Sequence, residues 1–92
     1  MKDIENSLTI DLSAGKKVVL LLKQGREVIS RFQWTGLYKL SETLLPEIDK
    51  LLKKNKIKLT HIKEIEVKAS QESMVGTRIA KVIALGLKYD KL

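Results

Sequence analysis

Side chains that could carry out acid–base or metal chemistry are scarce in this sequence. Its 92 residues include no cysteine and one histidine, His61. Without cysteine there is neither a disulfide nor a thiolate nucleophile, and a lone histidine cannot assemble the ligands of a zinc site. We therefore expect His61 to be a solvated or turn-capping residue, and we expect neither a metal nor a cofactor.

Asp11 and Arg78 are two charged residues whose surroundings suggest a role. Asp11 is the one carboxylate among the polar residues that alternate with leucine and isoleucine over residues 7–12. One carboxylate without a phosphate-binding loop is not a catalytic centre, so the sequence predicts that the protein is not an enzyme. Arg78 could pair either with Glu72 or with a carboxylate of a partner, and the sequence leaves both open.

The chain has a net charge of +7, which is unevenly distributed. Residues 1–46 carry seven Lys/Arg against five Asp/Glu, and residues 47–92 carry eleven against six. A basic balance can attract nucleic acid or an acidic partner, although scattered lysines also simply keep a small domain in solution. A basic nucleic-acid-binding domain is therefore an alternative function, and it would use Lys50, Lys53, Lys54, Lys56, Lys58 and Lys63.

The length of the chain limits its organisation. A chain this short forms one modest core, so we expect a single domain over residues 1–92. Its longest apolar runs, such as Val18 to Leu22, fall far short of the roughly 20 residues that span a bilayer. The first six residues are too polar for a signal peptide. We expect a cytoplasmic protein without a membrane association.

Four segments have the alternation that is typical of strands. Three of them, residues 7–12, 16–24 and 26–34, are separated by short glycine-containing turns and predict an antiparallel meander. The fourth, residues 64–69, follows a helical segment and should therefore be parallel to a strand of the meander. The right-handed crossover rule places the first strand between the second and the fourth. The predicted fold is α/β, with a four-stranded mixed sheet and two helices.

The two predicted helices cover residues 41–54 and 74–88. In the first, large apolar residues recur at steps of three and four, and Leu45 and Leu52 widen the resulting stripe. The second is apolar around much of its circumference, and we expect Val75, Ile79 and Ile83 to cover the sheet. Such a helix usually buries its second side against another helix or a partner chain.

Several motifs occur in a fixed order along the chain: Ser-Leu-Thr-Ile-Asp-Leu-Ser (7–13), Ser-Glu-Thr-Leu-Leu-Pro-Glu-Ile-Asp-Lys-Leu-Leu (41–52), the stretch from Ile57 to Val67, and Gly76 with Arg78 and Ile79. This order resembles the TsaB family, also called YeaZ, the non-catalytic partner in bacterial threonylcarbamoyladenosine tRNA modification. The most specific part is Leu-Leu-Pro-x-Ile-Asp followed by Gly-x-Arg-Ile, and the resemblance spans residues 7–90. It implies half of a ribonuclease-H-like fold, namely one lobe of an actin-like ATPase.

The sequence also departs from the family pattern. The family's turn Gly-Pro-Gly-Ser-Phe-Thr-Gly is replaced by residues 70–76, Ser-Gln-Glu-Ser-Met-Val-Gly, so we do not expect this turn to cradle a phosphate. The family continues into a second lobe, whereas this chain ends at Leu92, so we expect no interlobe cleft within one copy.

The resemblance implies a non-catalytic interaction module. Its two helices would bind a TsaD-type protein or a second copy of the chain, with any connection to tRNA being indirect. The expected contacts lie on the exposed sides of the two helices and are Leu45, Leu52, Met74, Arg78, Val82 and Leu85.

Overall fold

Three consecutive strands form an antiparallel meander in the computed structural model, which describes residues 5–90. They are β1 (Asn6–Ala14), β2 (Lys17–Gln24) and β3 (Glu27–Thr35). Both connecting turns begin with a glycine of positive φ, Gly15 at 65° and Gly25 at 60°. A positive φ at the first turn residue alone is the pattern of a type II′ turn, which matches the right-handed twist of the two strands.

The fourth strand, β4 (Ile62–Lys68), pairs with β1 in parallel and gives the strand order β3-β2-β1-β4. Leu8 is opposite Ile65 and Ile10 is opposite Val67 in this pairing. The predicted mixed sheet, with the first strand between the second and the fourth, is confirmed. The fourth strand begins at Ile62, slightly earlier than its predicted start at residue 64.

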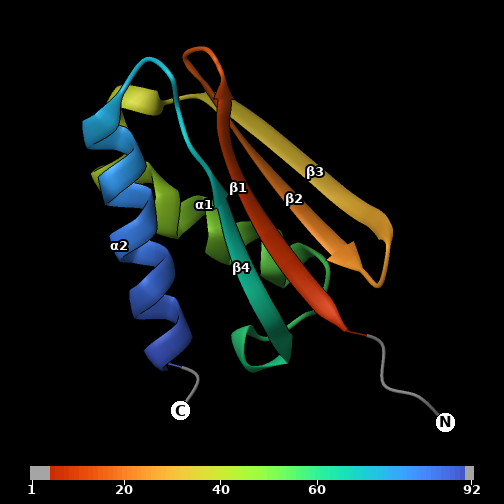
Figure 1. Cartoon of the computed structure of the whole chain (residues 1–92). Coiled ribbons are helices and arrows are strands. Elements are labelled where there is room, and N and C mark those ends of the chain that lie inside the picture. The colour runs from red at the N-terminus through yellow and green to blue at the C-terminus, as the bar shows by residue number, and fades with distance from the viewer. Residues whose placement is uncertain (1–4, 91–92) are drawn as a thin grey trace, which may run out of the picture.

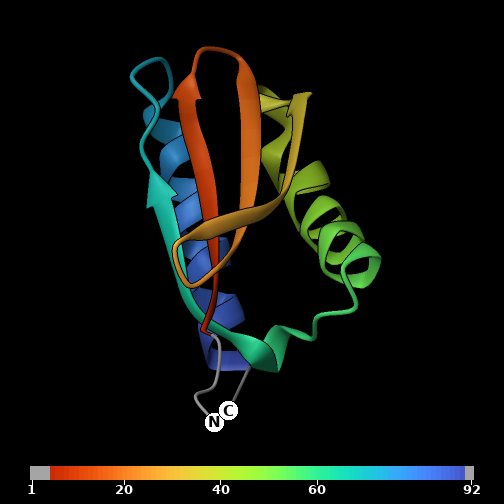
Figure 2. The same cartoon turned by 90° about the vertical axis from the view of Figure 1, so that its right-hand side faces the viewer.

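Both helices, α1 (Leu40–Lys54) and α2 (Met74–Asp90), lie on the same face of the sheet, as Figures 1 and 2 show from two sides. A short 3-10 helix, Leu37–Lys39, leads directly into α1. Because α1 begins at Leu40, Pro46 lies inside the helix. The ring of Pro46 is on the exposed side. Among the helices that the structure describes, none is long and apolar enough to cross a membrane.

The core lies between the sheet and the helices, and strand alternation defines its sheet side. Leu8, Ile10 and Leu12 of β1 are fully buried, as are the matching residues of β2, Val18, Leu20 and Leu22. The helix side comes mainly from the predicted stripe of α1, which includes Leu44 and Ile48. Period-two and period-3.6 patterns thus meet in one aliphatic cluster.

Helix α2 packs against the sheet and α1 through its smallest residues. Ala80 and Ala84 are buried, together with Thr77 and, near the end of the helix, Leu87. The predicted sheet-facing role is wrong for Val75, which is exposed, whereas Ile79 and Ile83 are partly buried and pack against the core cluster. Small side chains allow the helix backbone to approach its neighbours closely, so the alanines are the residues that α2 buries most completely.

Candidate protein-interaction site

Four large apolar residues expected to bind a partner are exposed on the two helices. The exposed fractions are 49% for Leu45 of α1, and 73%, 68% and 53% for Met74, Val82 and Leu85 of α2. An isolated exposed apolar residue is ordinary on a protein surface, but several on adjoining helices form a patch that water solvates poorly. We call these four residues, together with Arg78, the helix-pair surface.

A shallow depression of about 390 Å³ lies between α1 and α2 within this surface. Its lining is mainly aliphatic and consists of Ser41, Leu45, Arg78, Ile79, Val82 and Ile83. Ile79 and Ile83, which the sequence pattern assigned to the sheet, thus form part of its wall. The depression could receive an apolar side chain from another molecule, with Arg78 available to a carboxylate at its border.

Leu52 does not belong to the helix-pair surface, and its expected role as an exposed contact is wrong. It is only 6% exposed and is part of the core cluster. Leu59, from the connection between α1 and β4, and Leu87, near the end of α2, lie with it around a second depression. A helical projection of residues 41–54 places Leu52 at the edge of the stripe but cannot show that these two leucines cover it.

Arg78 is exposed, and a pairing with Glu72, one of the two alternatives that the sequence left open, is not among the ion pairs of residues 5–90. Those ion pairs join Lys50 to Glu47 at 3.9 Å and Lys53 to Asp49 at 3.0 Å, both within α1. Two of the six lysines that would serve a nucleic-acid-binding domain are therefore in contact with neighbouring carboxylates. His61 is exposed in a 3-10 turn, as expected of a solvated histidine.

Asp11 is held by its close neighbour Ser13. One carboxylate oxygen accepts hydrogen bonds from the Ser13 hydroxyl at 2.6 Å and from the Ser13 backbone N–H at 2.8 Å. Partial burial opposes ionisation of Asp11, but these hydrogen bonds and the nearby charges of Lys68 and Arg31 outweigh it and lower the pKa. The carboxylate therefore stabilises the end of β1 in its ionised form.

The loop before α2 uses serine side chains to bind its own backbone amides. The Ser70 hydroxyl accepts from the N–H groups of Glu72 and Ser73, at 3.0 and 3.1 Å, and the Ser73 hydroxyl accepts from Gly76 at 2.8 Å. Ser73 thereby caps the start of the helix. Amides that could face a phosphate in a glycine-rich turn are occupied here, which agrees with the expectation from the altered motif.

A third concave surface, which the sequence did not reveal, lies between β3 and α1. It has a volume of about 320 Å³ and is lined by Ser30, Arg31, Phe32, Glu47, Lys50, Leu51 and Lys54. We call it the strand–helix groove. Phe32 pairs with the buried Leu20 and therefore lies on the helix-facing side of the sheet, where it is 42% exposed.

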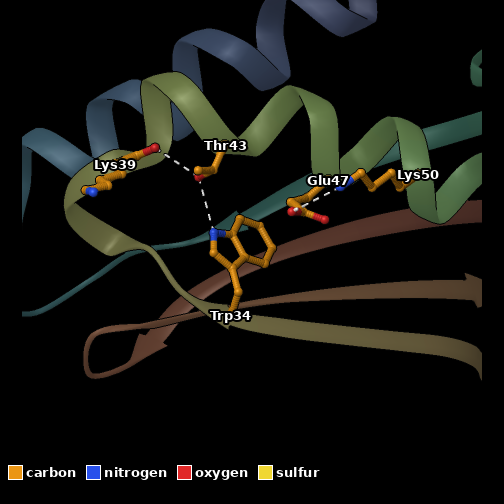
Figure 3. A network of polar contacts seen from close by, with 5 residues as sticks. All are labelled: Trp34, Lys39, Thr43, Glu47 and Lys50. Carbon is orange, nitrogen blue, oxygen red and sulfur yellow. Dashed lines mark hydrogen bonds and ion pairs between the residues drawn. The ribbon is translucent and has the colours of Figure 1, made fainter.

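Trp34 lies next to Phe32, one of the residues that line this groove. Its indole N–H donates to the Thr43 hydroxyl at 3.2 Å, and that hydroxyl donates to the Lys39 carbonyl at 2.9 Å. Figure 3 shows the indole between β3 and α1, with Glu47 and Lys50 farther along the same helix. The ring also stacks on Phe32, with 5.8 Å between centroids. Trp34 is thus partly buried and packs at the edge of the core.

Similar solved structures share the strand order and the two helices on one face of the sheet. YeaZ from Pseudomonas aeruginosa superposes with a TM-score of 0.82 and 19% identity over 96% of this chain. A second structure, of an uncharacterized Pseudomonas aeruginosa protein with similarity to peptidase YeaZ, gives 0.79 at the same identity and coverage. At 19% identity this likeness establishes the fold.

The chain corresponds to 40% of the length of each of these two structures. The expected recognition of a partial YeaZ fold is confirmed on this basis. No family model and no curated protein matches the chain.

Proposed function

We propose that this chain is a non-catalytic interaction module whose helix-pair surface binds a TsaD-type protein or a second copy of the chain, in the context of threonylcarbamoyladenosine modification of tRNA. The observation that carries the proposal is the exposed aliphatic patch around the depression between α1 and α2. The likeness of fold to YeaZ and the motifs in residues 41–52 and 76–79 favour this kind of partner.

The energetics of the helix-pair surface support association. Burying a large aliphatic side chain completely is worth about 1.5–3 kcal/mol, so half-exposed residues such as Leu45 and Leu85 retain roughly half of that. Four such residues and the aliphatic walls of the depression could offset part of the 4–15 kcal/mol estimated cost of association. Arg78 would add orientation by pairing with a carboxylate, because rim charges contribute specificity more than affinity.

The substitution Val82→Glu tests the proposal. It places a carboxylate at the centre of the patch, and burying an unpaired charge costs several kcal/mol. Val82 is 68% exposed, so the free variant should keep its circular dichroism spectrum and its melting temperature. In sedimentation velocity, the wild type should form a complex with itself or with the TsaD-type protein of the same organism, and the variant should not.

Val28→Glu is the matched control, because Val28 is also exposed but lies on β3. It should associate like the wild type. A wild type that is monomeric at high micromolar concentration and does not bind the TsaD-type protein would contradict the proposal. Binding to RNA that weakens steeply between 50 and 200 mM salt would instead favour the nucleic-acid-binding alternative, because phosphate contacts are strongly salt-dependent.

A further inference from the structure

The outer edge of β3 lies next to the strand–helix groove. Within residues 5–90, β3 is an edge strand, so the backbone groups on its outer side have no strand partner. A bulge interrupts its pairing with β2 near Leu22 and Lys23, but Ser30 to Thr35 pair in regular register. Bulges discourage the addition of another strand, whereas a regular edge invites it. The available part of the edge is thus the part that borders the groove.

The other edge of the sheet, β4, is less suited to pairing. Its sequence Ile-Lys-Glu-Ile-Glu-Val-Lys places exposed charges at Lys63, Glu64, Glu66 and Lys68. Closely spaced charges protect an edge strand from unwanted partners. The regular half of β3 has one charged residue, Arg31, between Ser30 and Phe32. The two edges therefore differ in a way that favours addition at β3.

The groove has an apolar floor and a basic helical wall. Phe32 and the buried Leu51 form the floor, and the wall comes from Glu47, Lys50 and Lys54 of α1, which share one face of the helix. The ion pair between Lys50 and Glu47 is long, at 3.9 Å, and the Lys50 side chain is largely exposed. Alternation turns the Arg31 side chain to the opposite face of the sheet, where it helps to lower the pKa of Asp11.

We propose that the strand–helix groove binds an extended acidic peptide segment, which adds to the sheet along Ser30 to Thr35. Main-chain hydrogen bonds to β3 would hold the segment, as in other cases of strand addition. Its side chains alternate, so one set enters the groove between Phe32 and Lys54, and the other set lies on the face of Arg31. Lysines on one side and an arginine on the other make acidic residues favourable on both faces. This surface is separate from the helix-pair surface.

The experiment uses the full chain and a defined probe, the acetylated and amidated heptapeptide Glu-Glu-Val-Val-Glu-Glu-Val, which places glutamates on both faces of an extended strand. Trp34 is the only tryptophan and stacks on Phe32, so its fluorescence reports occupancy of the groove. We expect a saturable change in emission and the same dissociation constant by calorimetry. A peptide with lysine in place of glutamate should bind at least about tenfold more weakly, since unfavourable charge contacts replace favourable ones.

Strand addition makes a specific prediction for backbone-methylated peptides. Only one edge of the added strand faces β3, and alternate amides point to it. Of two peptides that are N-methylated at the odd or at the even amides, one should lose binding and the other should keep it. Equal binding of both would overturn the proposal. The proposal would also be overturned if the tryptophan emission did not saturate at millimolar peptide, or if the lysine peptide bound as tightly as the acidic one.

Protein variants locate the binding to the groove. The pair Lys50→Gln and Lys54→Glu should weaken the acidic peptide about tenfold, whereas Lys63→Gln with Lys81→Glu, which changes the net charge equally away from the groove, should not. Val82→Glu should bind the peptide as tightly as the wild type does, which separates this proposal from the helix-pair surface.

Two results would assign the groove to another ligand. Displacement of the peptide by a uridine decamer would assign it to nucleic acid, and a dimer abolished by Phe32→Glu would assign it to a second copy. Either result would overturn the proposal.

Discussion

At the scale of single residues, Asp11 shows how a carboxylate can be fixed by the chain that directly follows it. Its carboxylate is bound by the Ser13 hydroxyl and N–H, within the same turn of chain. The sequence placed Asp11 at the end of β1 but could not show this local hydrogen bonding, which depends on the backbone direction after Leu12. Asp11 therefore acts as a cap for the strand.

The lowered pKa of Asp11 predicts a pH dependence of stability. A carboxyl whose pKa falls on folding stabilises the native state above its unfolded value, about 3.9, and this contribution is lost as pH falls through the folded pKa. Asp11→Asn keeps an oxygen acceptor for Ser13 but removes the charge. Urea unfolding should show the variant less stable than the wild type at pH 7, with the difference shrinking below about pH 4. A difference independent of pH would contradict this role.

Gly36 is required by its neighbour Trp34. A Cβ at this position would lie 2.2 Å from the indole Nε1 and 2.5 Å from Cδ1, far inside contact distance. Gly36→Ala should displace the indole from Thr43 and destabilise the fold by about 1–3 kcal/mol, as overpacking typically does. A shift in the tryptophan emission maximum together with a lower melting temperature is expected. Gly86→Ala, with open space around its Cβ, is the control.

At the scale of elements, the sequence predicted the strands more accurately than the packing of the helices. Alternation in 7–12 and the apolar run 18–22 determine which strand residues are buried, because each strand has only two faces. A helix that is apolar on several sides offers more choices. In α2 the close approach allowed by Ala80 and Ala84 decided the orientation, and a hydrophobic pattern gives small residues little weight. Leu52 was wrongly predicted to be an interface residue for a related reason. The residues beside it, Leu59 and Leu87, come from segments that are distant in the sequence.

The end of α1 contains a residue in an unfavourable conformation. Lys56 has φ of 56°, and the N–H of Ile57 donates to the Leu52 carbonyl while that of Lys56 donates to Lys53. This is a Schellman motif, in which glycine normally occupies the left-handed position. Lys56→Gly should stabilise the protein by about 1 kcal/mol and raise the melting temperature by about 4–8 °C. Lys54→Gly, which removes the same charge inside the helix, should lower it.

At the scale of the whole molecule, the fold resembles part of YeaZ, and the loop between β4 and α2 binds its own backbone amides. Ser70 and Ser73 already accept from its amides, and Ser73 caps α2. We predict that Mg-ATP gives no saturable heat in a calorimetric titration at millimolar nucleotide. Micromolar binding would contradict this account of the loop.

The position of β1 in the middle of the sheet also affects the order in which the molecule can fold. Its partner β2 follows after a two-residue turn, so the meander forms from contacts that are local in sequence. Its other partner, β4, lies more than fifty residues away, as the Asn6 side chain bonded to the His61 carbonyl illustrates. Closing such a loop costs conformational entropy before the pairing of the strands stabilises the chain. The rate of folding should therefore be limited by the step in which β4 pairs with the edge of β1 that the meander leaves open. This step comes after the meander has formed and while α1 is still docking.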